Sequence, residues 1–517
     1  MLGAAVSLLL AALTRMLLYA FLLLAASYIL PYYWDTYDLR KHPGPITARF
    51  STFWLAYYAR HGQRYRAVHA AHQRYGRIVR IAPNQLSIAD ADALPVVYGH
   101  STGTLKSTFY DAFVASVHRG LFNTRNRVDH TRKRKIISHT FSQRSILELE
   151  PYIATTLKAF LAKWDIKCEL AKDRWECDAL PWFNYFAFDV IGDLAFGRPF
   201  GMVAAEADRT VVEDDQGHTF TASAVRILNE RGEYSATQGA IWPPLRPYMK
   251  YCDPWFARGL ASVKNLTGIA RSRVNQRLRE GAGERKDLLA RLQQGKDEQG
   301  HPMGKDELTA EALTQLIAGS DTTSNSSCAI VFFIARHSQV KRRLQQELDT
   351  ELAGKASDDG VLTFDEVKRL PYLAACIDEG LRRHSTSSIG LPRIMPDHVV
   401  FKDVPIRAGT VLSVPSYTIH HDETYWSEPF TYNPDRWLDS SADVKQSREK
   451  AFNPFSTGPR ACIGLNVARL ELLVFIASLF FRYEIDLQDE SLDELPTREG
   501  FLRKPLYCHL KISRRAS

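Results

Sequence analysis

At 517 residues, with 45% hydrophobic and 24% charged side chains, the chain has the composition of a globular protein with a sizeable core. Its net charge of +8 indicates an anionic neighbour, either a membrane surface or an acidic protein. The sequence holds no zinc-finger or RNA-binding signature, so we expect no nucleic-acid partner. The seven cysteines are scattered and form no Cys-x-x-Cys pair, which argues against a disulfide framework and for a reducing compartment.

The first expected element is an apolar helix at residues 1–34, whose only charged side chain is Arg15. Residues 16–34 carry no charge and are long enough to span a hydrocarbon core of about 30 Å. Arg40 and Lys41 follow the helix, which predicts that the bulk of the protein faces the cytosol. A cleaved signal peptide is the competing interpretation, but the stretch is too long and lacks a clear cleavage site. We therefore expect an uncleaved, single-pass membrane anchor.

A proline-containing hinge at residues 35–45 follows the anchor. It ends in His42-Pro43-Gly44-Pro45, a stiff segment that cannot continue a helix. We expect the remaining residues, 46–517, to form one domain.

The hydrophobic pattern of this domain is mostly helical. Short strands are expected only near its beginning and end. The expected elements are a helix at 65–75, a hairpin of 78–81 with 85–88, helices over about 125 to 355, short strands between 386 and 415, and a last helix at 463–483. The pattern predicts a mainly α fold with a minor β-sheet region.

The loop FSTGPRACIG, from Phe455 to Gly464, carries the strongest chemical signal. It turns sharply at Gly458 and presents Cys462 at the start of the last helix, where N–H groups and the helix dipole favour a thiolate. A thiolate in such a place is typical of a haem-iron ligand that favours O–O cleavage. Phe455 would pack beside the sulfur, Gly464 would let the helix approach the porphyrin, and Arg460 would pair with a propionate. The alternative is a structural cysteine in a Gly-rich turn.

A helical run at 308–340 is interrupted by the hexad Ala318-Gly319-Ser320-Asp321-Thr322-Thr323. Gly weakens a helix and Thr bonds back to the preceding turn, so this composition indicates a functional site. Beside a haem, Ala318 and Gly319 would leave room for oxygen, while Asp321 and Thr322 would deliver protons. A capped or kinked core helix is the alternative.

A charge cluster is expected from two further motifs. Glu379 and Arg382 lie three residues apart and therefore on one helix face, and Arg436 in Pro-Asp-Arg-Trp is their natural third member. We assign these three to folding and to the integrity of the haem pocket. An exposed helix pair is the alternative for any such spacing taken alone.

In this order, the hexad, the Glu-x-x-Arg pair, the Pro-Asp-Arg-Trp segment and the cysteine loop resemble the cytochrome P-450 superfamily over about residues 46–515. The resemblance implies one cytochrome P-450 fold that binds haem b through a cysteine thiolate. It also implies propionate contacts from Arg134 and Arg393, and from His130, which stands where the superfamily usually has Trp. The alternative is a solvated basic face, which could also dock an acidic electron donor.

Within the superfamily, the chain is most similar to the fungal benzoate 4-monooxygenases. The likeness rests on KSTFYDAFV at 106–114, on residues 308–328, on HSTSSIGLPR at 384–393 and on TREGFLRKPL at 497–506. It implies para-hydroxylation of benzoate to 4-hydroxybenzoate with O2. A buried carboxylate needs a partner, for which the candidates are Tyr110, Ser385, Ser387 and Arg503.

No GxGxxG fingerprint follows a strand, so the chain is not built to bind NADPH or flavin itself. We expect electrons from NADPH through a separate, membrane-bound flavoprotein reductase, which places the protein in the endoplasmic reticulum membrane. One alternative is a monooxygenase for a larger aromatic substrate in a biosynthetic pathway. Others are a haem-binding protein or a peroxide-dependent isomerase, but neither needs the proton donors Asp321 and Thr322.

Overall fold

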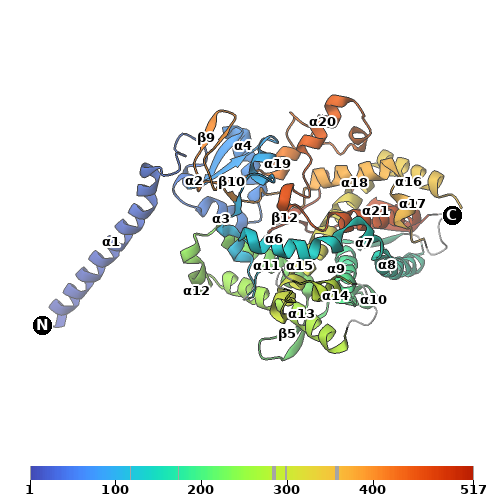
Figure 1. Ribbon diagram of the computed structural model, residues 1–517, viewed down its shortest axis with the longest axis horizontal. Helices are drawn as coiled ribbons and strands as arrows, with labels where there is room; N and C mark the ends of the chain where they lie inside the picture. Colours follow the sequence, from blue (N-terminus) through green and yellow to red (C-terminus); the bar gives the residue numbers. More distant parts are fainter. Residues whose placement is uncertain are drawn as a thin grey trace.

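A long helix, α15 (Lys305–Arg336), lies inside the body of the protein (Figure 1). Several of its residues line the candidate site. The computed structural model describes residues 2–116, 118–172, 174–281, 287–296, 300–354 and 360–515. The helices with the largest contacts to α15 are α9 (Leu180–Phe196), α13 (Pro254–Glu280), α18 (Pro371–His384) and α21 (Leu465–Arg482).

Helices dominate the chain, which confirms the mainly α fold. Besides the N-terminal helix, the remaining ones are α2 (Ile46–Phe50), α3 (Phe53–Arg60), α4 (Arg64–Tyr75), α5 (Ala93–Tyr98), α6 (Arg127–Ser138), α7 (Gln143–Leu147), α8 (Glu150–Ala171), α10 (Met202–Ala205), α11 (Ala224–Ala240), α12 (Met249–Cys252), α14 (Leu288–Gln294), α16 (Ser338–Leu352), α17 (Phe364–Val367), α19 (Ser416–His420) and α20 (Ala442–Ala451). The expected run at 308–340 is two helices, because His337 leaves the helical conformation (φ −110°, ψ 87°) between α15 and α16.

The largest sheet has the strand order β1-β2-β10-β7-β3. Its strands are β1 (Ile78–Ala82), β2 (Gln85–Ile88), β10 (Val411–Ser413), β7 (Arg393–Ile394) and β3 (Leu105–Lys106). The β1–β2 hairpin and the late strands confirm the predicted β region. In the antiparallel pair of β3 and β7, Lys106 lies directly opposite Arg393. Residues paired in this way share one face of a sheet, so two basic side chains are brought together.

Four smaller sheets complete the fold. One has the order β11-β14-β4, and the others are hairpins. Their strands are β11 (Tyr483–Leu487), β14 (His509–Arg514), β4 (Trp175–Asp178), β12 (Thr497–Glu499) with β13 (Arg503–Pro505), β5 (Thr210–Glu213) with β6 (Thr219–Ala222), and β8 (Val399–Phe401) with β9 (Val404–Ile406).

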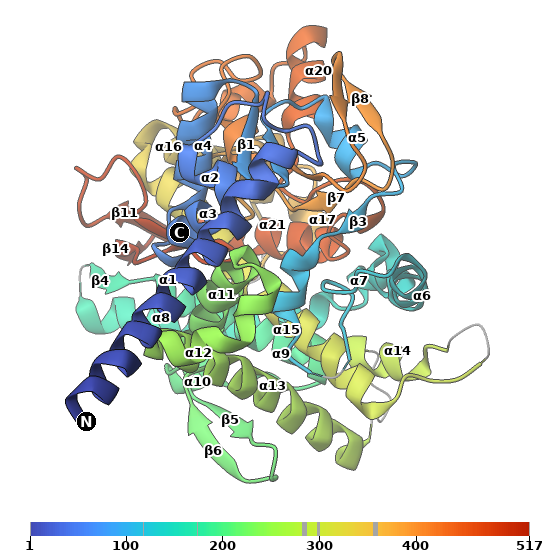
Figure 2. The ribbon, with the colours of Figure 1, turned by 90° about the vertical axis from the view of Figure 1, so that its left-hand side faces the viewer.

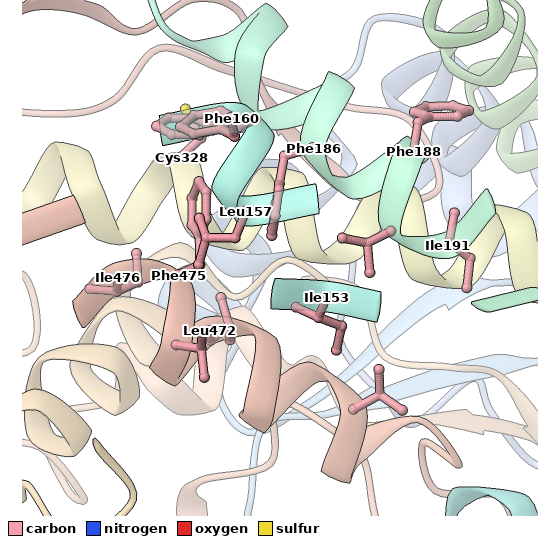
Figure 3. Close-up of a cluster of buried hydrophobic side chains, with 14 of the residues drawn as sticks. Ile153, Leu157, Phe160, Phe186, Phe188, Ile191, Cys328, Leu472, Phe475 and Ile476 are labelled. Atoms are coloured by element: carbon pink, nitrogen blue, oxygen red, sulfur yellow. The ribbon is translucent and has the colours of Figure 1, made fainter. Parts of the chain in front are cut away.

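Aromatic packing holds α21 against α8 and α9 (Figure 3). The ring of Phe475 on α21 stacks on Phe186 with centroids 4.4 Å apart and meets Phe160 edge-on at 5.3 Å. All three side chains are fully buried, and offset aromatic pairs contribute beyond the area they bury. Because the cysteine loop leads directly into α21, this core also fixes where that loop lies.

The N-terminal helix α1 (Leu2–Trp34) projects from one side of the body (Figures 1 and 2). Its segment Leu9–Trp34 is long and apolar enough to cross a membrane and is not buried by the rest of the protein. After it, the connector packs against β1, where the Arg80 N–H donates to the Pro43 carbonyl (2.8 Å). A Cβ at Gly44 would lie 2.2 Å from the Arg80 carbonyl oxygen, so only glycine fits there.

Candidate active site

A cavity of about 340 Å³ lies between α15 and the loop before α21. From α15 it is lined by Ala318, Gly319 and Thr322. The loop lines it with Phe455, Ser456 and the segment from Arg460 to Gly464. The structure therefore brings together the two motifs that the sequence singled out.

The cysteine loop is held in a conformation that presents its thiol to the cavity. Gly458 has a positive φ of 75°, and a Cβ there would lie 1.8 Å from the Tyr98 carbonyl oxygen, so no other residue fits. The Cys462 N–H donates to the Phe455 carbonyl (2.9 Å) and closes the loop. Helix α21 begins at Leu465, two residues after the predicted start, because Gly464 stands outside the helix as its N-cap.

The Cys462 thiol is accessible from the cavity although it lies deep in the protein. Burial raises the pKa of this thiol, while the Gly464 N–H and the Arg134 charge act in the opposite direction. The local field alone therefore does not produce the expected thiolate. Coordination to a bound metal cation would deprotonate the thiol.

Basic side chains gather beside this loop. The Arg134 guanidinium donates to the Ala461 carbonyl (3.0 Å), and Arg460 donates to the Thr124 carbonyl (2.7 Å). His130 lines the cavity one turn before Arg134. Lys106 lines it as well, whereas Arg393, its partner across the sheet, stands behind it and donates to the Tyr110 hydroxyl.

This basic group has no acidic counterpart. In the part of the chain that the structure describes, no carboxylate forms an ion pair with Lys106, Arg134, Arg393 or Arg460. Burial lowers the pKa of Lys106 well below its usual value, and burial together with Arg460 lowers the pKa of His130 to about 3. These side chains have hydrogen-bond acceptors but no counter-ion among the described residues, and burying a charge without a counter-ion is unfavourable, so the site favours a bound anion. The propionates of a haem whose iron is ligated by Cys462 match this requirement.

The hexad of α15 divides between two environments. Ala318 faces the cavity, but the missing side chain of Gly319 is explained by packing: a Cβ there would lie 2.6 Å from Cδ1 of Ile191 on α9. The Thr322 hydroxyl lines the cavity and donates to the Ala318 carbonyl (2.6 Å). Ala318 and Gly319 thus both line the cavity, and Gly319 also lets α15 pack closely against α9.

Asp321 points away from the cavity. Its Oδ1 forms a buried ion pair with the Lys504 ammonium of β13 (2.7 Å) and accepts a hydrogen bond from the Asn325 amide (3.2 Å). Lys504 also donates to the Asn229 side chain of α11. The sequence did not single out Lys504, because its partner Asp321 lies far away along the chain.

Glu379, Arg382 and Arg436 come together in a buried cluster. Glu379 Oε1 lies 2.8 Å from Arg382 Nη2 and 3.1 Å from Arg436 Nε. Arg382 also donates to the carbonyls of His420 (2.6 Å) and Pro429 (2.8 Å), so it ties α18 to the segment that leads to the cysteine loop. Burial by itself would raise the pKa of Glu379, but the charges of Arg382 and Arg436 keep this pKa below its usual value.

The four candidates for a partner of the substrate carboxylate lie in different places relative to the cavity. Ser387 lines the cavity. Tyr110 is fully buried and receives the Arg393 hydrogen bond. Ser385 and Arg503 are not among the residues that line the cavity. The Ser385 hydroxyl is hydrogen-bonded to the Arg382 carbonyl (2.8 Å) and to His420 Nδ1 (2.6 Å). Arg503 donates to the His384 carbonyl (3.0 Å) and to the Thr497 hydroxyl (3.0 Å). We therefore withdraw Ser385 and Arg503 as substrate contacts.

Comparisons with known proteins agree with this geometry. The family model described as cytochrome P450 matches residues 42–512. The chain is 47% identical to "Benzoate 4-monooxygenase bphA" of Aspergillus niger over 95% of this chain and 96% of the relative. It is 31% identical to "Cytochrome P450 monooxygenase BOA3" of Botryotinia fuckeliana over 88% and 87%, and 30% identical to "Cytochrome P450 monooxygenase AKT7" of Alternaria alternata over 87% and 84%. A thiol facing a cavity rimmed with unpaired cations is what a haem-thiolate centre requires, and the chain belongs to the cytochrome P450 family.

Proposed function

We propose that this monooxygenase hydroxylates benzoate at the para carbon. The reaction consumes benzoate, O2, NADPH and a proton, and yields 4-hydroxybenzoate, water and NADP⁺. The 47% identity to a benzoate 4-monooxygenase over nearly the whole chain is the observation that carries this proposal.

The cavity suits a small aromatic acid. Its apolar wall includes the rings of Phe113, Phe122 and Phe501, which meet with centroids 4.8 Å (Phe113–Phe501) and 5.2 Å (Phe122–Phe501) apart. Such a wall accepts a flat ring, and fixing the carboxylate at one point would aim the para C–H in one direction. Regioselectivity on this account is a matter of positioning.

In this proposal, some residues of the chain bind the haem and others deliver protons. Cys462 would hold a haem, which would supply the iron at which dioxygen is activated. Arg134, Arg460, Lys106 and His130 would hold the anionic edge of that haem. Thr322 Oγ1 delivers protons at the cavity wall, and Asp321 Oδ1 takes them up from the Lys504 side.

We further propose how the protein is placed and supplied with electrons. Residues 1–34 anchor the protein in the endoplasmic reticulum membrane. Residues 35–45 form the hinge between this anchor and the cytosolic domain, which comprises residues 46–517. An NADPH-dependent flavoprotein reductase in the same membrane supplies the electrons. The apolar, unburied helix Leu9–Trp34 supports this arrangement.

The test is reconstitution of the full-length holoenzyme with such a reductase in lipid vesicles. We expect benzoate to move the haem's Soret band and to raise NADPH consumption, with 4-hydroxybenzoate as the product. If benzoate leaves the Soret band unmoved and no hydroxylated product forms, the benzoate assignment fails.

A further inference from the structure

A buried arginine on α11 lines the cavity away from the basic group at the cysteine loop. Arg231 is 5% exposed, and its guanidinium lies 5.2 Å from the centre of the Phe113 ring. Its Nη2 donates to the Phe113 carbonyl over a long 3.4 Å. Within the described residues it forms no ion pair, so a full positive charge faces the cavity without an anion bound to it.

Arg231 keeps its charge although it is buried. Burial lowers the pKa of Arg231 to about 10, and the negative charge of Asp321 on α15 acts against this shift. The guanidinium is therefore charged at neutral pH.

Two amides from the lining of the same cavity have polar atoms without a hydrogen-bond partner among the described residues. Asn123 donates to the same Phe113 carbonyl (2.9 Å), and its own carbonyl oxygen has no partner among the described residues. Gln315, on α15, is 8% exposed, and neither atom of its amide is hydrogen-bonded within the described chain. Both side chains line the cavity. Buried polar atoms are rarely left unpaired, so these amides point to a polar ligand.

Backbone contacts connect the three side chains. Arg231 and Asn123 meet at the Phe113 carbonyl. The segment that carries Asn123 is tied to α15, where the Leu121 N–H donates to Glu311 Oε2 (3.0 Å), one helical turn before Gln315. Arg231, Gln315 and the aromatic ring of Phe113 thus all line this cavity, and Arg231 lies against Phe113.

We propose that Arg231 binds the carboxylate of the aromatic acid substrate, that Gln315 donates a second hydrogen bond to it, and that the ring lies against Phe113. This inference rests on the proposed function and names the contact that orients the substrate. A buried guanidinium recognises a carboxylate through charge-assisted hydrogen bonds, which a neutral isostere of the same shape cannot match.

The test compares benzoate with benzamide, which has nearly the same shape but no charge. Binding of each to the holoenzyme is measured by calorimetry for the wild type, Arg231→Gln and Arg231→Lys. Removing one partner of a buried charge pair costs enough to weaken benzoate binding by at least roughly 30-fold in Arg231→Gln. Benzamide binding should change by less than about 3-fold, and Arg231→Lys should restore part of the benzoate affinity.

A control variant and a second test variant distinguish loss of the carboxylate contact from misfolding. Arg226 is exposed on the same helix, so Arg226→Gln should bind both ligands as the wild type does. Gln315→Leu leaves Arg231 in place and should weaken benzoate binding by about 10-fold, because a hydrogen bond to a charged group is lost, with little effect on benzamide. This second variant tests the same contact if Arg231→Gln fails to fold.

The outcomes separate this inference from the proposed function. Equal weakening of benzoate and benzamide in Arg231→Gln, or unchanged benzoate binding in both Arg231→Gln and Gln315→Leu, would overturn the role of Arg231 while benzoate hydroxylation stands. If benzoate binds in an Arg231-dependent way but no 4-hydroxybenzoate forms with the reductase, the proposed function fails and the carboxylate contact stands.

Discussion

Asp321 and Thr322 are adjacent on α15, yet their side chains meet different surroundings. The Thr322 hydroxyl borders the cavity, and Asp321 is held by Lys504 and Asn325 behind it. Adjacent positions on an α-helix point in directions about 100° apart, which accounts for the two surroundings. In the proposed mechanism, protons therefore pass from the Lys504 side of α15 to the cavity side.

Substituting these two residues should separate electron use from product formation. Proton transfer by a positioned side chain contributes about 10²-fold or more, so Thr322→Ala and Asp321→Asn should slow hydroxylation by roughly 10²-fold. NADPH consumption should fall much less, since electron transfer does not depend on these groups. The measurement is product formed per NADPH consumed.

Thr322→Ser is the matched control, because it keeps the hydroxyl that bonds to Ala318. It should couple NADPH consumption to product nearly as the wild type does. A Thr322→Ala enzyme with an unchanged yield of product per NADPH would rule out the assigned role of Thr322.

At the scale of elements, the Glu379 cluster joins α18 to the chain before the cysteine loop. Glu379→Gln should destabilise the fold by about 3–5 kcal/mol, because it leaves the buried charges of Arg382 and Arg436 without their partner. Chemical unfolding of the holoenzyme measures this loss. A change below about 1 kcal/mol would show that the cluster does not hold these elements together.

The same cluster predicts a pH dependence. The pKa of Glu379 is lower in the folded protein than its usual value of 4.5, so its contribution is fully present above that pH and is lost as the pH falls through the folded pKa. Unfolding free energies measured on the acid side should therefore fall more steeply for the wild type than for Glu379→Gln.

A second buried carboxyl, Glu471 on α21, should behave in the opposite way. Burial raises its pKa from 4.5 to about 8, with the Thr323 hydroxyl as its partner on α15. The folded state therefore favours the protonated acid, and stability should fall as the pH rises from about 4.5 to 8. Thermal unfolding of Glu471→Gln, which is neutral throughout, should match the wild type in mild acid and exceed it in alkaline buffer. Parallel loss of stability in both proteins would contradict this assignment.

At the scale of the whole molecule, α1 and the domain are separable. The helix projects from the body, and near its C-terminal end the Tyr32 ring lies 4.8 Å from the ring of Phe50 (Figure 1). Deleting residues 2–30 keeps this contact and removes the apolar span. We expect the truncated protein to leave the membrane fraction with the haem spectrum of the full chain. Loss of haem on truncation would show that α1 supports the fold.

The sequence predicted the fold, and it singled out the motif residues because their signals are local. The cysteine loop, the hexad of α15 and the Glu379 cluster are each short runs whose composition has a physical meaning. Contacts across long sequence distances were not predictable: Lys504 pairs with Asp321, Lys106 faces Arg393, and Arg231 reaches the cavity only through the packing of α11. Arg503 was misjudged for the same reason, since its partners become visible only in the fold.

One measurement tests the central claim most directly. The holoenzyme, with its reductase and NADPH, is given benzoate under isotopically labelled dioxygen, and the product is analysed by mass spectrometry. The account predicts 4-hydroxybenzoate that carries one labelled oxygen atom, at the para position. A product without the label, a product hydroxylated elsewhere on the ring, or no product would contradict it.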